Sequence, residues 1–157
     1  MDSENLFQET KDALQARGVD LEKLADIVLL MQQRHSPELT KKQALENILG
    51  VLKKREVQHA VLTGVMIDEV VENKKTNNPI KKLVEEDDGL YGVDETLALS
   101  IVNCYGSIAA SNFGYLDIIK PGIIKDFDTD GKQVHTFLDD ILCAIAAAAC
   151  SRYAHNK

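Results

Sequence analysis

TFLDDILCAIAAAAC, which spans Thr136 to Cys150, is one of the most apolar stretches of the sequence. Its apolar residues lie on many sides of a helix, and we expect a helix over about 133–154. Because no stretch of the chain shows the sustained alternation of a half-buried strand, the protein is predicted to be all-α. Further helices are predicted over about 4–17, 21–34, 55–74, 79–86 and 93–111, and after a capping box formed by Thr40 and Gln43.

Two adjacent aspartates, Asp139 and Asp140, stand within this apolar stretch, between Phe137-Leu138 and Ile141-Leu142. Neighbouring residues differ by about 100° around a helix, so at least one of the two carboxylates should lie near the buried face. An unpaired carboxylate is costly to bury, and its burial requires either a cation or protonation. The pair therefore indicates a functional site.

The rest of the chain predicts one compact bundle. The apolar positions of the 55–74 helix surround most of its circumference, so we expect that helix to be central and largely buried. Segment 114–121 is predicted to be irregular, 122–127 to be a short helical or extended piece, and 128–131 to be a turn. Since the sequence shows no repeat and no interdomain linker, residues 1–157 are predicted to form a single-domain bundle of six or more helices around a central buried helix.

Composition limits the classes of partner. The chain has 157 residues, of which 45% are hydrophobic and 27% charged, and a net charge of −7 argues against nucleic acid as a ligand. The acidic, polar start is unlike a signal peptide, and no apolar run reaches the roughly 18 residues of a membrane-spanning helix. We expect a cytoplasmic protein with at most peripheral contact at the inner face of the membrane. The many-sided apolar helices 55–74 and 133–154 also predict a homo-oligomer.

Two further acidic sites resemble the aspartate pair in their apolar surroundings. Asp94 and Glu95 open the apolar segment 96–102, and Asp117 stands in FGYLDIIKP. Each of these sites alone is explained by a favourable charge or cap at a helix end. Together with Asp139 and Asp140 they predict an oxygen-ligand site for Mg²⁺, with Mn²⁺ as an acceptable substitute. The pair Asp68-Glu69 is a further, weaker candidate.

A cation and two histidines complete the set of chemically interesting residues. Lys120 follows Asp117 by three residues, and we expect its ammonium group to grip a phosphate beside the metal, although an ordinary surface lysine would look the same. His59 and His135 have no metal-like partners at helical spacing, so we expect a partly buried His59 and a surface His135. Neither a phosphate-binding glycine loop nor a nucleophilic serine elbow is present in the sequence.

Three motifs give a resemblance to a known family. Val93-Asp94-Glu95, the segment FGYLDIIKP at 113–121 continued by Phe127-Asp128, and Leu138–Ile141 (LDDI) occur in the family's order over about 90–150. In these motifs the chain resembles the phosphatidylglycerophosphatase A family, in the soluble Gram-positive branch that includes the low-temperature-requirement C proteins. The family's glycine- and proline-rich N-terminal motif has no clear counterpart in this sequence.

The resemblance implies an activity. Family members remove the terminal phosphate of phosphatidylglycerol phosphate during phospholipid synthesis and require Mg²⁺, and the soluble branch folds as a helical bundle. It implies that Asp94, Glu95, Asp117, Asp139 and Asp140 are the metal and catalytic set and that Lys120 faces the phosphate. The expected protein is thus a Mg²⁺-dependent phosphomonoesterase acting on a phosphorylated lipid. Two alternatives stay open: a soluble phosphatase of a small phosphoester, and a non-catalytic interaction protein whose carboxylates bind metal only to stabilise the bundle.

Overall fold

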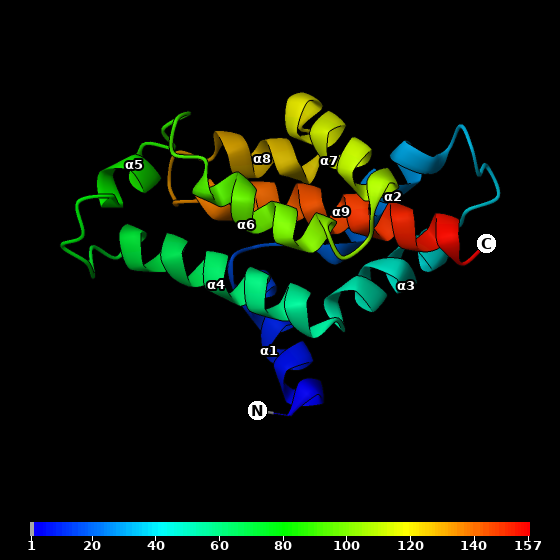
Figure 1. Cartoon of the computed structure of the whole chain (residues 1–157), viewed down its shortest axis with the longest axis horizontal. Coiled ribbons are helices and arrows are strands. Elements are labelled where there is room, and N and C mark those ends of the chain that lie inside the picture. The colour runs from blue at the N-terminus through cyan, green and yellow to red at the C-terminus, as the bar shows by residue number, and fades with distance from the viewer. Residues whose placement is uncertain (1) are drawn as a thin grey trace.

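The computed structural model describes residues 2–157, and within this range it contains helices and no strand (Figure 1). The prediction of an all-α protein with at least six helices is confirmed. The helices are α1 (Ser3–Ala16), α2 (Leu21–Gln32), α3 (Lys41–Leu52), α4 (Arg55–Glu72), α5 (Lys81–Glu85), α6 (Val93–Val102), α7 (Ser107–Ile119), α8 (Ile123–Thr129) and α9 (Thr136–His155).

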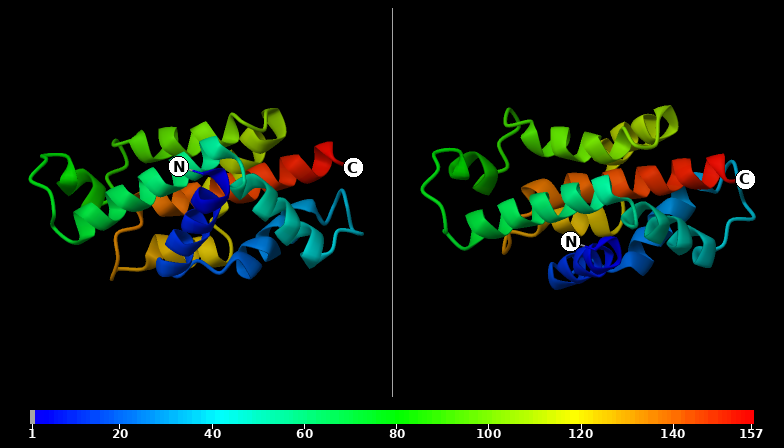
Figure 2. Two further views of the ribbon diagram at one scale, coloured as in Figure 1. Left: turned by 90° about the horizontal axis from the view of Figure 1, so that it is seen from below. Right: turned by 60° about the horizontal axis from the view of Figure 1, so that its bottom comes forward.

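The centre of the bundle is α9. It runs along the long axis of the molecule, and α2, α3, α4, α6, α7 and α8 all pack against it (Figures 1 and 2). Every residue from Thr136 to Ser151 is buried. A helix that is apolar on all sides is stable in water only where other elements surround it, and the sequence of α9 has this character.

The expectation that the 55–74 helix would be central is wrong. Helix α4 buries one side against α9, α6 and α1, while His59, Thr63 and Met66 form a solvent-facing stripe along it. Met66 is 56% exposed. These three residues follow the spacing of one helix face, so α4 is an ordinary amphipathic helix whose outer stripe is only weakly polar.

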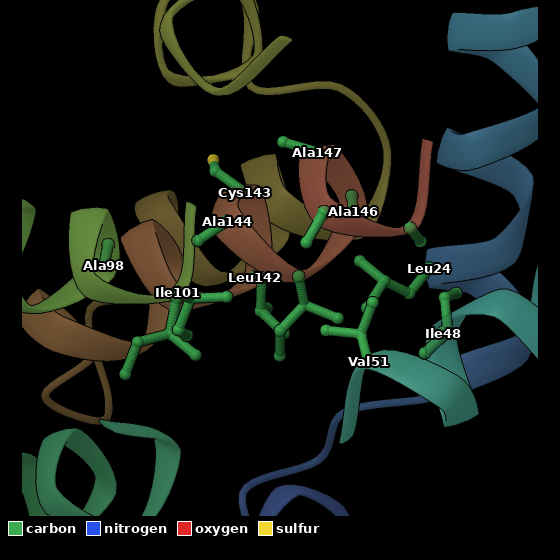
Figure 3. Packing of buried hydrophobic residues seen from close by; sticks show 14 of the residues in the cluster. Leu24, Ile48, Val51, Ala98, Ile101, Leu142, Cys143, Ala144, Ala146 and Ala147 are labelled. Atoms are coloured by element: carbon green, nitrogen blue, oxygen red, sulfur yellow. The ribbon is translucent and has the colours of Figure 1, made fainter. Parts of the chain in front are cut away.

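Small residues on α9 let its neighbours approach closely. In the close view, Cys143 and Ala147 leave the helix on one side, and Leu142 and Ala146 leave it on the other (Figure 3). Gly64 of α4 serves the same contact, because a Cβ atom there would lie 2.3 Å from Cδ1 of Ile141. The alanines of α9 and the glycine of α4 therefore allow close packing around α9.

Several helix ends follow the sequence signals. Asp20 caps α2 by accepting a hydrogen bond from the Glu22 N–H, and Thr40 forms the predicted capping box with Gln43.

Other boundaries differ from expectation. The predicted helix 93–111 is broken at Gly106, whose φ of +84° glycine adopts without strain, so α6 and α7 are separate. The segment around Asp117 is helical rather than irregular, because Phe113 and Leu116 are both buried on one side of α7.

The burial of α9 and the length of the helices bear on two predictions, the homo-oligomer and the lack of a membrane-spanning segment. From Thr136 to Ser151, the apolar sides of α9 are covered by helices of its own chain. The predicted homo-oligomer stays a prediction. Within residues 2–157, none of the helices combines the length and the apolar character needed to cross a membrane.

Candidate metal centre

Five of the six predicted site residues converge on the first turns of α9. Asp94 lies at the start of α6, Asp117 in the last turn of α7, and Lys120 directly after α7. Asp139 lies at the end of the first turn of α9 and Asp140 follows it, and both are buried. The helices α6 and α7, which carry two of the partners, both pack along α9. The tertiary fold thus assembles residues that are up to 46 positions apart.

One half of this cluster contains the basic side chain of Lys120. Its ammonium Nζ lies 2.6 Å from Oδ1 of Asp128 and 3.2 Å from Oδ2 of Asp139. Oxygens of Asp87, Asp128 and Asp139 lie within 4.8 Å of one another, a spacing that suits a single cation. Lys120 itself supplies positive charge at this place in the structure. Burial lowers the pKa of Lys120, but the hydrogen bond to Asp128 and the charges of Asp139 and Asp128 outweigh it and raise the pKa.

The other half of the cluster holds carboxylates without such a partner. The carboxyl groups of Asp94 and Asp140 are close enough to share a hydrogen bond, and the charge of Asp117 acts on Asp140 as well. Within residues 2–157, no ion pair joins Asp94, Asp117 or Asp140 to a basic side chain. Carboxylates crowded together in this way repel one another unless a proton or a metal ion compensates their charge.

The cost of burying charge is seen in the raised pKa values of Asp139 and Asp140. Burial raises the pKa of Asp139 to about 7, and the Lys120 charge opposes that rise. Burial also raises the pKa of Asp140 well above its usual range, and the charges of Asp139, Asp94 and Asp117 add to the rise. The pair is held in place by a hydrogen bond of 2.8 Å from the Asp140 N–H to Oδ1 of Asp139. Such a site takes up a proton when no metal neutralises it.

Oxygen donors dominate the chemistry of the cluster. The nearest sulfur belongs to Cys143, one helical turn beyond Asp139, and it is buried. Burial raises the pKa of this thiol, and the charge of Asp140 raises it further. A thiol that keeps its proton is a poor metal ligand. Carboxylates alone suit a hard cation such as Mg²⁺ or Mn²⁺.

Two members of the cluster were absent from the predicted set. Asp87 follows α5 and adopts a φ of +50°, and Asp128 lies in α8 rather than in the predicted turn. Asp128 directly follows Phe127 in the motif that carries Asp117, which was the available signal. Nothing local marks Asp87, since its pair Asp87-Asp88 precedes a glycine and resembles an ordinary turn.

The remaining candidates have other placements. Glu95 is exposed on α6, and its part in metal binding stays a prediction. Asp68 is fully buried, and both of its oxygens accept backbone N–H groups at the start of α9, so it acts as a cap. The two expectations for histidine are wrong. His59 is exposed, whereas His135 is buried, edge-on to the Phe127 ring at 4.7 Å between ring centroids.

The comparison with known proteins identifies the family. The sequence profile of phosphatidylglycerophosphatase A matches residues 16–155 of this chain. The chain belongs to this family.

Two proteins of Bacillus subtilis are similar to this phosphatidylglycerophosphatase A family member over most of their length. YpjQ of Bacillus subtilis is 53% identical over 147 residues, which cover 94% of this chain and 83% of YpjQ. YutG of the same organism is 49% identical over 91% of this chain and 87% of YutG. The match extends well beyond the three motifs, into the helices that precede them.

Solved structures show the same fold. The crystal structure of YpjQ from Bacillus subtilis superposes with a TM-score of 0.95 at 49% identity and covers 99% of this chain and 97% of the other. The low temperature requirement C protein from Listeria monocytogenes gives a TM-score of 0.93 at 49% identity, with 96% of each chain covered. The resemblance to the branch that includes the low-temperature-requirement C proteins is thereby confirmed.

The buried carboxyls predict that this family member, free of metal, loses stability as the pH rises. Asp139 holds its proton in the folded chain at pH values where the unfolded chain has released it. Between about pH 4 and pH 7 the unfolded state thus binds fewer protons, and the free energy of unfolding falls with increasing pH. The change of the Asp139 pKa from 3.8 to about 7 corresponds to at most about 4 kcal/mol.

Thermal melting in EDTA measures this dependence. The melting temperature is expected to fall from about pH 5 to pH 8, and Asp139→Asn is expected to flatten the slope. Added Mg²⁺ should restore more stability at the higher pH, because metal and proton compete for the same oxygens. A melting temperature that stays constant or rises over this range in EDTA would contradict the electrostatic description of the cluster.

Proposed function

We propose that the protein is a Mg²⁺-dependent phosphomonoesterase that removes the terminal phosphate of phosphatidylglycerol phosphate in the cytoplasm. Membership of the phosphatidylglycerophosphatase A family supports a phosphatase. The observation that carries the proposal is the convergence of Asp94, Asp117, Asp139 and Asp140, all on α9 or on helices packed against it, with a lysine at the edge of the group. A structural role alone would favour apolar residues at such buried positions.

The roles within the site follow from charge and placement. Asp94, Asp117 and Asp140 are proposed to hold Mg²⁺, or Mn²⁺ in its place, because their charges lack a basic partner. Asp139 is proposed to share the same site, and Glu95 to complete it from the exposed side of α6. When bound, such an ion neutralises charge on phosphate oxygens and lowers the pKa of a water molecule. A carboxylate that is free of the ion can accept the proton of the attacking water.

Lys120 is proposed to contact the phosphate. Its backbone lies in the left-handed region, with a φ of +41°, which is unfavourable for a residue with a side chain. The surrounding helix end and Pro121 hold it there, and the ammonium group reaches back to Asp128 and Asp139. Strain of this kind persists where the fold fixes it, and it is common at functional sites. A phosphate that enters the site can accept a hydrogen bond from the ammonium group of Lys120, which then interacts less with the two carboxylates.

Exposed apolar side chains near the acidic residues support a lipid substrate. Leu90 is 97% exposed and Val93 is half-exposed, and these two residues precede Asp94. Ile118 is 83% exposed and directly follows Asp117, and the next residue, Ile119, is partly exposed as well. Large apolar side chains that stand in water next to a polar site are typical of contact with a partner or a lipid surface. We propose peripheral contact with a bilayer through these residues.

Replacing Ile118 with glutamate tests the lipid contact. Phosphate release from phosphatidylglycerol phosphate in mixed micelles is expected to fall roughly tenfold, since one exposed isoleucine contributes on the order of 1.5 kcal/mol when buried. Release from a soluble phosphate ester should change little. Leu30→Glu, on α2, which carries none of the acidic site residues, is the matched control because Leu30 is also exposed. Equal losses on lipid and soluble ester would contradict a lipid-specific role for Ile118.

The substrate class itself is tested with wild-type protein. Phosphate release is measured from the lipid in mixed micelles and from glycerol 3-phosphate, each with Mg²⁺ and with EDTA. The proposal expects Mg²⁺-dependent release from the lipid and little from the soluble ester. Release from the soluble ester alone would instead indicate a phosphatase of small metabolites. Metal binding without any release would indicate a non-catalytic protein.

A further inference from the structure

The helix that carries both buried aspartates has no cap of its own. His135, the residue before α9, makes no capping hydrogen bond with its side chain. The first N–H groups of a helix lack partners within the helix, and a buried helix start must find them elsewhere. For α9 the partner comes from another helix, 69 residues earlier in the sequence.

Asp68 of α4 supplies the missing cap. Its Oδ1 accepts the N–H of Phe137 at 3.1 Å, and its Oδ2 accepts the N–H of Leu138 at 3.0 Å. The side chain is fully buried, so water has no access to these groups. Both carboxylate oxygens are thus committed to the first turn of α9. Because this carboxyl group occupies the helix start, the start is not free to bind a phosphate.

A second anchor holds the segment just before α9. Arg17 donates two hydrogen bonds to Glu72 of α4, each of 3.1 Å, and a third of 2.7 Å to the Val134 carbonyl oxygen. Oε1 of Glu72 accepts the Val134 N–H at 2.8 Å. Both backbone groups of Val134 are therefore fixed by one partly buried ion pair. Asp68 and Glu72 lie one turn apart on α4, so the two anchors act from the same helix.

We propose that Asp68 is a positioning residue, which caps α9 from α4 and thereby fixes where Asp139 and Asp140 lie in the metal centre. The inference rests on the proposed metal-dependent function. Asp139 follows Leu138 directly, so a shift or fraying of the first turn moves the aspartate pair with it. The proposal also gives the N-terminal part of the chain, which lacks the three motifs, a part in the site: it holds the helix that carries the ligands.

The test compares Asp68→Ala, Asp68→Asn and the control Glu69→Gln, which removes a charge from the next position of α4. Mn²⁺ affinity is measured by calorimetry on proteins whose folding is checked by circular dichroism. Asp68→Ala is expected to weaken Mn²⁺ binding roughly tenfold to hundredfold. Asp68→Asn, which keeps one acceptor oxygen, should lose less, and Glu69→Gln should match wild type. A purely structural cap would lower the melting temperature and leave the affinity of the folded protein unchanged.

Hydrogen exchange gives a readout that needs no metal. The amides of Phe137 to Asp140 are expected to exchange faster in Asp68→Ala than in Glu69→Gln. If Asp68→Ala does not fold, Asp68→Asn and Glu69→Gln provide the same comparison. Wild-type affinity and exchange in the folded Asp68 variants would overturn the proposal. So would equal affinity losses in the Ala and Asn variants with unchanged exchange, since charge alone then explains them. Should wild-type protein bind no Mn²⁺, the proposed function fails, and exchange alone decides whether Asp68 holds the helix start.

Discussion

Replacing Asp140 with asparagine is expected to remove Mg²⁺-dependent phosphate release while leaving the helical fold intact. Asp140 is 4% exposed, its carboxyl group is close to that of Asp94, and the charges of Asp139, Asp94 and Asp117 act on it. Asparagine keeps the shape of the side chain but lacks the negative charge that holds a hard cation. Because stabilisation of charge on the transferring phosphate then fails, kcat should fall by a factor on the order of 10³.

The same substitution should make the metal-free protein more stable. Burial and neighbouring charge raise the pKa of Asp140, so ionising this carboxyl in the folded chain is costly, and asparagine removes that cost. In EDTA at about pH 8, Asp140→Asn should melt at a higher temperature than wild type. Asp126→Asn on the exposed side of α8 is the control and should change neither property. Wild-type turnover in Asp140→Asn would show that the residue has no catalytic role.

Replacing any one of the four consecutive alanines of α9 with leucine is expected to destabilise the protein. Residues 146–149 point in four directions about 100° apart, and each is fully buried. Inserting three carbon atoms into a filled interior forces strain, so each Ala→Leu variant is expected to lose about 1–3 kcal/mol of unfolding free energy. An amphipathic helix would tolerate leucine on at least one side. The scan therefore tests directly whether α9 is enclosed on all sides.

Urea denaturation measures the four variants against Ala110→Leu, which lies on the exposed side of α7. That control is expected to stay within about 0.5 kcal/mol of wild type. If two neighbouring alanines of α9 accept leucine without loss, the helix has an open side, and the central position assigned to it is wrong.

Local signals in the sequence predicted much of the fold. The caps at Asp20 and Thr40 act between residues that are close in sequence, and the structure contains both. The identity of the central helix was harder to predict, because α4 and α9 both show apolar residues on several sides. The difference lies in neighbours: His59 and Thr63 face water on α4, whereas every side of α9 meets another helix. The spacing of apolar residues describes one helix by itself, whereas the burial of that helix depends on which other helices pack against it.

The sequence predicts those residues of the candidate site that belong to the three motifs. Asp94, Asp117, Lys120, Asp139 and Asp140 stood out in the sequence, and the fold brings them together. Asp87 joins through a turn with a left-handed backbone, and Asp68 meets α9 across 69 positions of the chain. Such long-range contacts leave no local pattern, since each residue alone looks like an ordinary turn or helix aspartate.

The most direct test of the central claim is an anomalous difference map from crystals soaked in MnCl₂. The claim is that the carboxylates around the start of α9 form a divalent metal site. We expect a Mn²⁺ peak at about 2.0–2.3 Å from carboxylate oxygens, among Asp94, Asp117 and Asp140. That peak should be absent from crystals of Asp140→Asn. A wild-type map without a peak in this cluster, or with a peak only elsewhere on the surface, would contradict the claim.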